Sequence, residues 1–441
     1  MHDGDEDLQD REAAAAQPRR LAAAAAAVAV LAGAGVASAD GEALRPAVTA
    51  NGWQTTITGW VQVDAVAFDQ NSVDELEPNT REPLNRERFV IPRGRLRAEA
   101  RREVPGAGAL STAVEADLNT IDGPLARILA AQVGWTYPAR GTPLVAVTAG
   151  LFRTPFGMEV PMSERVKPFL EAPSFARALF PGNYDTGVTA QGAYGLARWQ
   201  VAIVNGAPAG DAQWRGRDPT SSYDLVGRLG AVVDGPRRWR FAGGVSALTG
   251  TGLHPGKGPT KDELQWVDDN QDGIVQLPEL QVLPGSPAQP SLTFERQALG
   301  ADVQAHWCLC RLGEGMAFFE VALATNLDRG LVYADPVSAK RDLRHLGYAI
   351  GVVQEVGKRF LVGIRYDRYD ADRDAFEQQG FDIVNVNKIF STLGAMATVR
   401  WQNARLLVQY DQERNPFGRG DDGQPITRRA DKLTIRAQVG F

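Results

Sequence analysis

The sequence predicts an all-β fold: a transmembrane antiparallel β-barrel of about 16 strands, with short periplasmic turns and long outer loops. Three observations support this prediction. Apolar and polar residues alternate in repeated segments of strand length between residues 55 and 441. The links between these segments are short and long in turn. Beyond residue 40, no apolar run reaches the length of about 18 residues that a spanning helix needs, so only a closed barrel would cross a membrane.

Composition narrows the function classes. The 441 residues are 44% hydrophobic and carry a formal net charge of −6, which argues against a nucleic-acid partner. Cys308 and Cys310 lie two residues apart in an expected strand, a spacing that does not fit a disulfide framework.

The N-terminus has the order of an export signal. Two arginines precede the apolar run LAAAAAAVAVLAGAGV, and the small residues Ala37-Ser38-Ala39 follow it. We predict a signal peptide over 1–39, with an atypical acidic leader, and a periplasmic segment over 40–54. The alternative is a membrane anchor, but the apolar run is short and rich in alanine.

Each predicted strand has one apolar and one polar face. In the first, 55–68, Val61 and Val63 share a face, while Gln62 and Asp64 share the other. The remaining strands are expected near 89–103, 109–119, 128–138, 143–153, 185–195, 196–205, 223–233, 238–248, 294–309, 315–326, 343–355, 358–369, 389–402, 404–414 and 431–441.

The links between the strands separate into two classes. Every second link is turn-like, as in VPGAGA, DGPRR and EVGK. The others are longer, at 69–87, 154–184, 206–222, 249–293, 327–342, 370–388 and 415–430, and only 120–127 is brief. A barrel has this rhythm, because its periplasmic turns are short and its outer loops are long.

Tryptophans mark one end of the predicted wall. Five of them fall beside the short turns and share the parity of the apolar face of their strand, as expected for an interfacial aromatic girdle. They are Trp135, Trp199, Trp239, Trp307 and Trp401. The final segment, KLTIRAQVGF, alternates up to Phe441 and resembles the C-terminal signature that outer-membrane barrels present to the barrel assembly machinery.

One predicted strand, 89–103, carries a row of cations. Arg93, Arg95, Arg97 and Arg101 share a face, and a lipid-facing arginine costs about 2–4 kcal/mol at the bilayer midplane, so the row is expected to line the lumen. Two roles remain open. The row attracts anions through its positive potential, or it pairs with the acids Glu99, Glu115 and Asp117.

A family resemblance starts at VTAGLFRTPFGMEV, residues 147–160. This segment resembles the G-x-F-K/R-x-P-F-G element of the phosphate-selective porins of the O and P type. The following segment, 163–195, resembles their inward loop and next strand. The resemblance implies a 16-stranded homotrimeric porin whose lumen passes anions. At the lysine-rich phosphate site of that family, this chain offers Arg165, Lys167 and Arg177 without a run of lysines.

The long link 154–184 mixes five prolines with apolar residues such as Phe169 and Phe175. Because phenylalanines avoid water, we expect this link to fold inward and narrow the lumen. The alternative is a mobile outer loop.

The link 249–293 contains DDNQDGIVQLPE, which matches the calcium-loop pattern D-x-[DN]-x-[DN]-G-x₅-E in every defined position. Oxygen ligands for a structural Ca²⁺ are predicted from Asp268, Asn270, Asp272, Ile274 (through its backbone carbonyl), Gln276 and Glu279. The alternative is an acidic, solvated turn.

Taken together, the sequence predicts a porin in the bacterial outer membrane, surrounded by lipid, through which small anionic or polar solutes such as phosphate diffuse passively. One alternative is a general or cation-leaning porin, because the net charge is negative. Another is a secreted, calcium-binding, β-rich protein of adhesion or carbohydrate binding. We see no cluster of catalytic residues and do not expect an enzyme.

Overall fold

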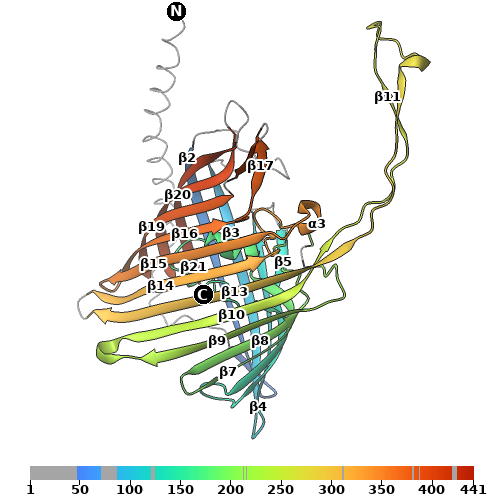
Figure 1. The fold of residues 1–441 in the computed structure, drawn as a ribbon. Coiled ribbons are helices and arrows are strands. Elements are labelled where there is room, and N and C mark those ends of the chain that lie inside the picture. Colours follow the sequence, from blue (N-terminus) through green and yellow to red (C-terminus); the bar gives the residue numbers. More distant parts are fainter. Residues whose placement is uncertain are drawn as a thin grey trace, which may run out of the picture.

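Sixteen antiparallel strands close into one barrel in the computed structural model (Figure 1). The structure describes residues 47–70, 87–120, 125–211, 213–214, 216–309, 312–379, 382–386, 388–419 and 425–441. The predicted signal peptide, 1–39, lies outside these residues. No helix in the described ranges is both long and apolar enough to cross a membrane.

The barrel strands follow one another in chain order, and each pairs with the next. They are β2 (Trp53–Gln70), β3 (Arg88–Val104), β4 (Gly108–Asn119), β5 (Leu125–Tyr137), β6 (Val145–Arg153), β7 (Tyr184–Tyr194), β8 (Ala197–Val204), β9 (Asp224–Asp234), β10 (Arg240–His254), β13 (Leu292–Leu309), β14 (Gly313–Thr325), β15 (Arg344–Val356), β16 (Phe360–Asp370), β19 (Ile389–Trp401), β20 (Ala404–Arg419) and β21 (Pro425–Gly440). Each of the predicted strands overlaps one of these, and the predicted fold class is confirmed.

The first and last barrel strands complete the ring. β2 pairs antiparallel with β21, with Trp60 opposite Gly440. The chain end continues this ladder, because the backbone N–H of Phe441 donates to the carbonyl of Gly59 at 2.9 Å. The ring of Phe441 lies so close to Gly59 that a Cβ added there would meet it at 2.5 Å.

Two strand boundaries differ from the prediction. Most of the expected long link 415–430 is strand, because β20 and β21 stay paired as far as Arg419 and Pro425, past an irregularity between Asn415 and Gly418. Part of the segment 40–54 is also strand. β1 (Ala47–Ala50) folds back onto the start of β2 through Asn51 and Gly52, which both have positive φ angles. In both places the pairing of backbone groups extends the ladder beyond the amphipathic pattern.

Short elements lie outside the barrel ladder. The chain between β10 and β13 forms a hairpin of β11 (Glu263–Trp266) and β12 (Leu280–Leu283), with the 3-10 turn η2 (Leu277–Glu279), and it extends away from the barrel (Figure 1). A second hairpin, β17 (Phe376–Gln379) with β18 (Asp382–Asn385), precedes β19. The remaining short elements are η1 (Pro236–Arg238), α2 (Ser174–Leu179) and α3 (Pro336–Ala339).

The outer face of the barrel wall is apolar. Along β13, Leu299 and Val303 are more than half exposed. Asp302 has the opposite parity, so its side chain points to the inside of the barrel, where it is buried. The same alternation places Leu229 of β9 and Ile350 of β15 on the exterior. Such a surface is stable against lipid hydrocarbon, and the paired backbone leaves no open edge within it.

The five girdle tryptophans lie at strand ends beside the short turns. Trp239 and Trp307 contact each other with ring centroids 5.4 Å apart. The indole N–H of Trp135 donates to the carbonyl of Ala107 in a turn at 2.7 Å, and that of Trp307 donates to Gln354 at 2.8 Å. Trp135 and Trp307 therefore satisfy their polar N–H groups at the strand ends, as interfacial tryptophans do.

Neighbouring residues of β13 provide a test of the two-sided wall. Val303 points to lipid and Gln304 points to the lumen. We expect Val303→Arg to destabilise the folded barrel by about 2–4 kcal/mol, because it places a charge in hydrocarbon. We expect the matched variant Gln304→Arg to cost less than about 1 kcal/mol, because its charge stays in water. Urea titration of folding into lipid vesicles measures both, and equal losses would contradict this orientation.

Candidate functional site

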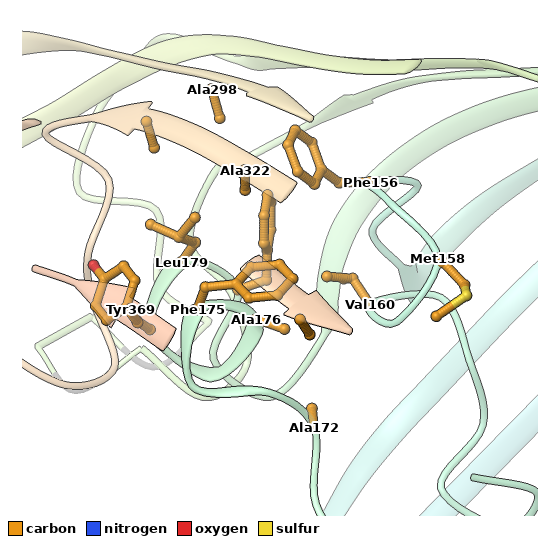
Figure 2. Packing of buried hydrophobic residues seen from close by; sticks show 14 of the residues in the cluster. Phe156, Met158, Val160, Ala172, Phe175, Ala176, Leu179, Ala298, Ala322 and Tyr369 are labelled. Atoms are coloured by element: carbon orange, nitrogen blue, oxygen red, sulfur yellow. The ribbon is translucent and has the colours of Figure 1, made fainter. Parts of the chain in front are cut away.

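The segment 154–183, between β6 and β7, lies inside the barrel. Phe156 and Phe175 are fully buried, and Leu179 of α2 is nearly so. They pack against small residues on the inner wall, among them Ala298 of β13 and Ala322 of β14 (Figure 2). Small wall residues leave room for the large side chains of the segment, so a lumen otherwise lined by polar groups holds an apolar core on one side.

Gly157 is the point where this inward loop turns onto the wall. Its φ angle is +62°, and a Cβ added there would lie 1.8 Å from the carboxylate of Glu320. That buried carboxylate accepts hydrogen bonds from the backbone N–H groups of Met158 and Glu159 at 2.9 and 3.1 Å. The last glycine of the element G-x-F-R-x-P-F-G is therefore required by both conformation and space.

Polar side chains of the far wall hold the rest of the loop. Asp367 of β16 accepts from the backbone N–H of Ser174 at 2.9 Å, and Gln409 of β20 accepts from that of Leu170 at 3.0 Å. Arg436 of β21 donates to the carbonyl of Leu170 at 2.9 Å. These bonds satisfy backbone groups that the irregular loop leaves unpaired, and they keep it in place.

The arginine row of β3 faces the lumen, and its members are paired. Arg93 donates to both carboxylate oxygens of Glu171 in the inward loop, at 3.1 and 2.8 Å. The same carboxylate accepts from Arg436 at 3.0 Å, and Arg436 also binds Asp64 of β2 at 2.7 and 2.8 Å. Three strands and the loop thus meet in one network of ion pairs.

The lower part of the row pairs with wall and loop acids. Arg95 lies 3.2 Å from Glu164 and 3.5 Å from Glu115, and its guanidinium stacks on the ring of Trp60. Arg97 binds Glu99 at 3.1 Å and Glu115 at 3.2 Å. Arg101 donates to the carbonyl of Ala139. Pairing therefore accounts for much of the charge in this row.

Sequence reasoning named the wall acids as partners but missed Glu164 and Glu171 of the loop. The available signal was their position, because carboxylates in a segment that folds inward need cationic partners once they leave water.

Both loop carboxylates lie outside the membrane-spanning strands and are held ionised. Burial by itself raises the pKa of Glu171, but the charges of Arg93 and Arg436 outweigh burial and bring this pKa well below its usual range. Burial also opposes ionisation of Glu164, yet Lys167 and Arg95 lower its pKa to about 2. The ion pairs between loop and wall therefore persist at neutral pH.

The three cations predicted in the loop have different environments. Lys167 is buried, with its ammonium 3.6 Å from both Glu159 and Glu164. Arg177 is half-buried on α2 and donates to Ser174 at 3.4 Å. Arg165 lines the open lumen and makes no ion pair with a carboxylate in the described part of the chain.

A cavity of about 460 Å³ lies between the loop and the inner wall of β2 to β8. Four arginines line it: Arg95, Arg97, Arg153 and Arg165. Neutral polar residues of β5 to β8 line it as well, including Gln132, Gln191 and Gln200. Sequence reasoning did not single out Arg153 or the glutamines, because a glutamine on a polar strand face looks the same in the lumen as on any wet surface.

The predicted calcium loop lies at the end of the β11–β12 hairpin. The carboxylate of Asp268 accepts from the backbone N–H groups of Asp272 and Gly273 at 3.2 and 2.9 Å. The carboxylate of Glu279 accepts from the indole N–H of Trp266 at 2.9 Å. Gly273 has a φ angle of +72°. The described residues contain no group of three or more His, Cys, Asp or Glu side chains in metal-holding geometry.

The fold is similar to that of solved bacterial outer-membrane proteins. The channel DcaP of Acinetobacter baumannii aligns with a TM-score of 0.53 at 12% identity, over 89% of this chain and 99% of that one. OprB of Pseudomonas putida aligns with a TM-score of 0.53 at 10% identity, over 88% and 94%. The trimer form of OmpT, an outer membrane protein of Vibrio cholerae, aligns with a TM-score of 0.51 at 9% identity, over 89% and 100%.

No protein-family model and no curated protein matches the chain. At these identities the structural likeness shows the fold alone.

Removal of the Glu171 carboxylate tests the clamp between loop and wall. We expect Glu171→Ala to free the loop segment near Leu170 and raise the open-channel current noise in planar bilayers, because Arg93 and Arg436 lose their shared partner. The Glu171 side chain is 38% exposed, so water screens the pair and we expect a loss of only about 1–2 kcal/mol. The matched control is Glu103→Ala, which breaks the exposed pair with Arg140. Identical noise in the wild type and Glu171→Ala would contradict the clamp.

Proposed function

We propose that the protein is a bacterial outer-membrane porin through which small hydrophilic solutes diffuse passively. The observation that carries this proposal is the polar cavity of about 460 Å³ that the inward loop leaves beside the wall of a closed barrel. The apolar exterior and the tryptophan girdle match insertion in lipid, and the aligned structures are outer-membrane proteins. A passive channel needs no catalytic group.

We propose a preference for anions in this channel. Four guanidinium groups line the cavity together with one carboxylate, that of Glu115. Arg97 and Arg95 share Glu115, and the buried carboxylate of Glu164 lies 3.2 Å from Arg95 and 3.9 Å from Arg153. Arg165 is free of carboxylate partners among the described residues, so four cations face two carboxylates. The local potential is therefore positive although the chain is acidic, and selectivity depends on the charges nearest the path.

The proposal extends to anions in general, with phosphate as one of them. The resemblance to phosphate-selective porins supports an anion pore, but the lysine that the inward loop offers, Lys167, is buried against Glu159 and Glu164. A passing anion would find its ammonium already neutralised.

We also propose a homotrimer. The aligned OmpT of Vibrio cholerae is described as a trimer form, and the apolar wall of this barrel provides a surface for contact within the membrane. Phe441 is half-exposed at the end of the last strand, which supports its proposed recognition by the barrel assembly machinery.

We propose a structural calcium site at the tip of the β11–β12 hairpin. The carboxylates of Asp268, Asp272 and Glu279, with the amide oxygen of Asn270, supply the hard oxygen donors that Ca²⁺ prefers. Gly273 adopts the left-handed conformation that the sharp turn of such a loop requires. A bound ion would neutralise these carboxylates and stiffen a hairpin that has little core of its own.

The anion preference is tested by the reversal potential of the purified channel in a steep KCl gradient. We expect the wild type to favour chloride and Arg165→Gln to lower the anion-to-cation permeability ratio by about twofold or more, because it removes the unpaired charge. Arg97→Gln should have a smaller effect, since acids already compensate its charge. Arg140→Gln, outside the cavity, is the control. A cation-selective wild type would refute the proposal.

The calcium site is tested by calorimetry of the purified porin. We expect binding with a dissociation constant of about 10⁻⁴–10⁻³ M, the range of extracellular modules, and its loss in Asp268→Ala. Glu263→Gln, on β11 but outside the loop, should bind as the wild type does. No heat of binding at millimolar calcium would exclude the site.

A further inference from the structure

The cavity beside the inward loop has two chemically different sides. Arg165 of the loop and Arg153 at the end of β6 contribute positive charge. Arg153 lies 3.9 Å from the carboxylate of Glu164, too far for a hydrogen bond. Gln191 of β7 and Gln200 of β8 contribute neutral amides. Because these groups come from separate elements around one space, a solute in the cavity meets cations and amides at the same time.

The cationic side has hydrogen-bonding capacity that the protein does not use. The buried Nε–H groups of Arg95 and Arg153 have no hydrogen-bond partner within the described residues. The Arg95 side chain is only 7% exposed. These Nε atoms are enclosed by the protein, so a solute meets the terminal nitrogens of Arg153 and Arg165 instead. Neither of these guanidinium groups donates a hydrogen bond to a carboxylate within the described residues, so an anionic oxygen that binds there gains free energy.

The neutral side is also incompletely satisfied. Gln200 donates one hydrogen bond to Thr189 at 3.2 Å, and Gln132 donates one to the carbonyl of Leu151 at 3.0 Å. Each primary amide has two N–H donors and an acceptor oxygen, so groups remain for a solute. Donors and acceptors together suit hydroxyl groups, which both give and accept hydrogen bonds.

We propose that this cavity transiently binds small hydroxylated carboxylates. The carboxylate lies toward Arg165 and Arg153, and the hydroxyls lie toward Gln191 and Gln200. This inference rests on the proposed porin function and specifies its preferred solutes. A simple carboxylate uses only the cationic side and a neutral sugar only the amide side, so a solute with both groups stays longest.

The test is single-channel recording of the full-length porin in planar bilayers, with gluconate, acetate and glucose added in turn. We expect gluconate to interrupt the current with a residence time about tenfold longer than that of either other probe, which corresponds to about 1.4 kcal/mol. Equal residence times for the three probes in a conducting channel would overturn the inference.

Two variants test which group of the solute binds to the cationic side of the cavity and which binds to the amide side. Arg165→Gln should shorten the residence of gluconate and acetate but leave that of glucose unchanged. Gln191→Ala should shorten the residence of gluconate and glucose but leave that of acetate unchanged. Lys358→Gln, exposed in a periplasmic turn, is the control. If Gln191→Ala shortened acetate as much as gluconate, the assignment of hydroxyls to the amide side would be wrong.

The outcomes separate this inference from the proposed function. A protein that inserts but conducts no ions refutes the porin and with it the inference. A channel that conducts ions but does not distinguish gluconate from acetate refutes the inference alone.

Discussion

Backbone hydrogen bonding around a closed ring is the constraint on which the rest of this molecule depends. Hydrocarbon offers no partner for an unpaired N–H or C=O, so the wall has to return to its first strand. β21 achieves this by pairing with β2 along its length, and the terminal Phe441 adds the last bonds of the ladder to Gly59. Closure also separates the side chains into two groups, because along each strand they point alternately to the lipid outside the barrel and to the lumen inside it.

A closed barrel wall also requires that the charged side chains in its lumen find partners of opposite charge. Acids and arginines that are excluded from lipid gather in the lumen, and many of them are too enclosed to be solvated one by one. Arg436, almost fully buried, lies between Asp64 and Glu171. The inward loop therefore contributes carboxylates as well as apolar bulk. Its ion pairs offset the wall charges, and its phenylalanines fill the space over the small residues of β13 and β14.

The loop divides the lumen unequally. Its apolar part packs on the side of β8 to β19, and its polar edge, with Arg165, faces the cavity beside β2 to β8. The open space is therefore bordered by the arginine strand on one side and by the amides of β5 to β8 on the other. In the function we propose, this asymmetry gives an acidic protein a pathway with a positive potential. A solute in the cavity meets the arginines without close carboxylate partners, whereas the ion-paired arginines lie deeper between the loop and the wall.

The sequence by itself determined the wall. The alternation of residues, the short and long links and the tryptophans at strand ends are local patterns, and they predicted the barrel strands because lipid and water impose opposite chemistry on adjacent residues. They also placed the arginines of β3 in the lumen. Pairing of backbone groups extended β20 and β21 past the amphipathic pattern, so their outer ends were missed.

Only the tertiary structure decided which charges remain available. Arg165 and Lys167 are two residues apart in the same loop, yet one is open to the cavity and the other is buried against Glu159 and Glu164. The partners of Arg93 and Arg95 lie in the loop about 70 to 80 residues away. An ion pair depends on distance in space, and that distance is established only when the wall has closed and the loop has packed inside it.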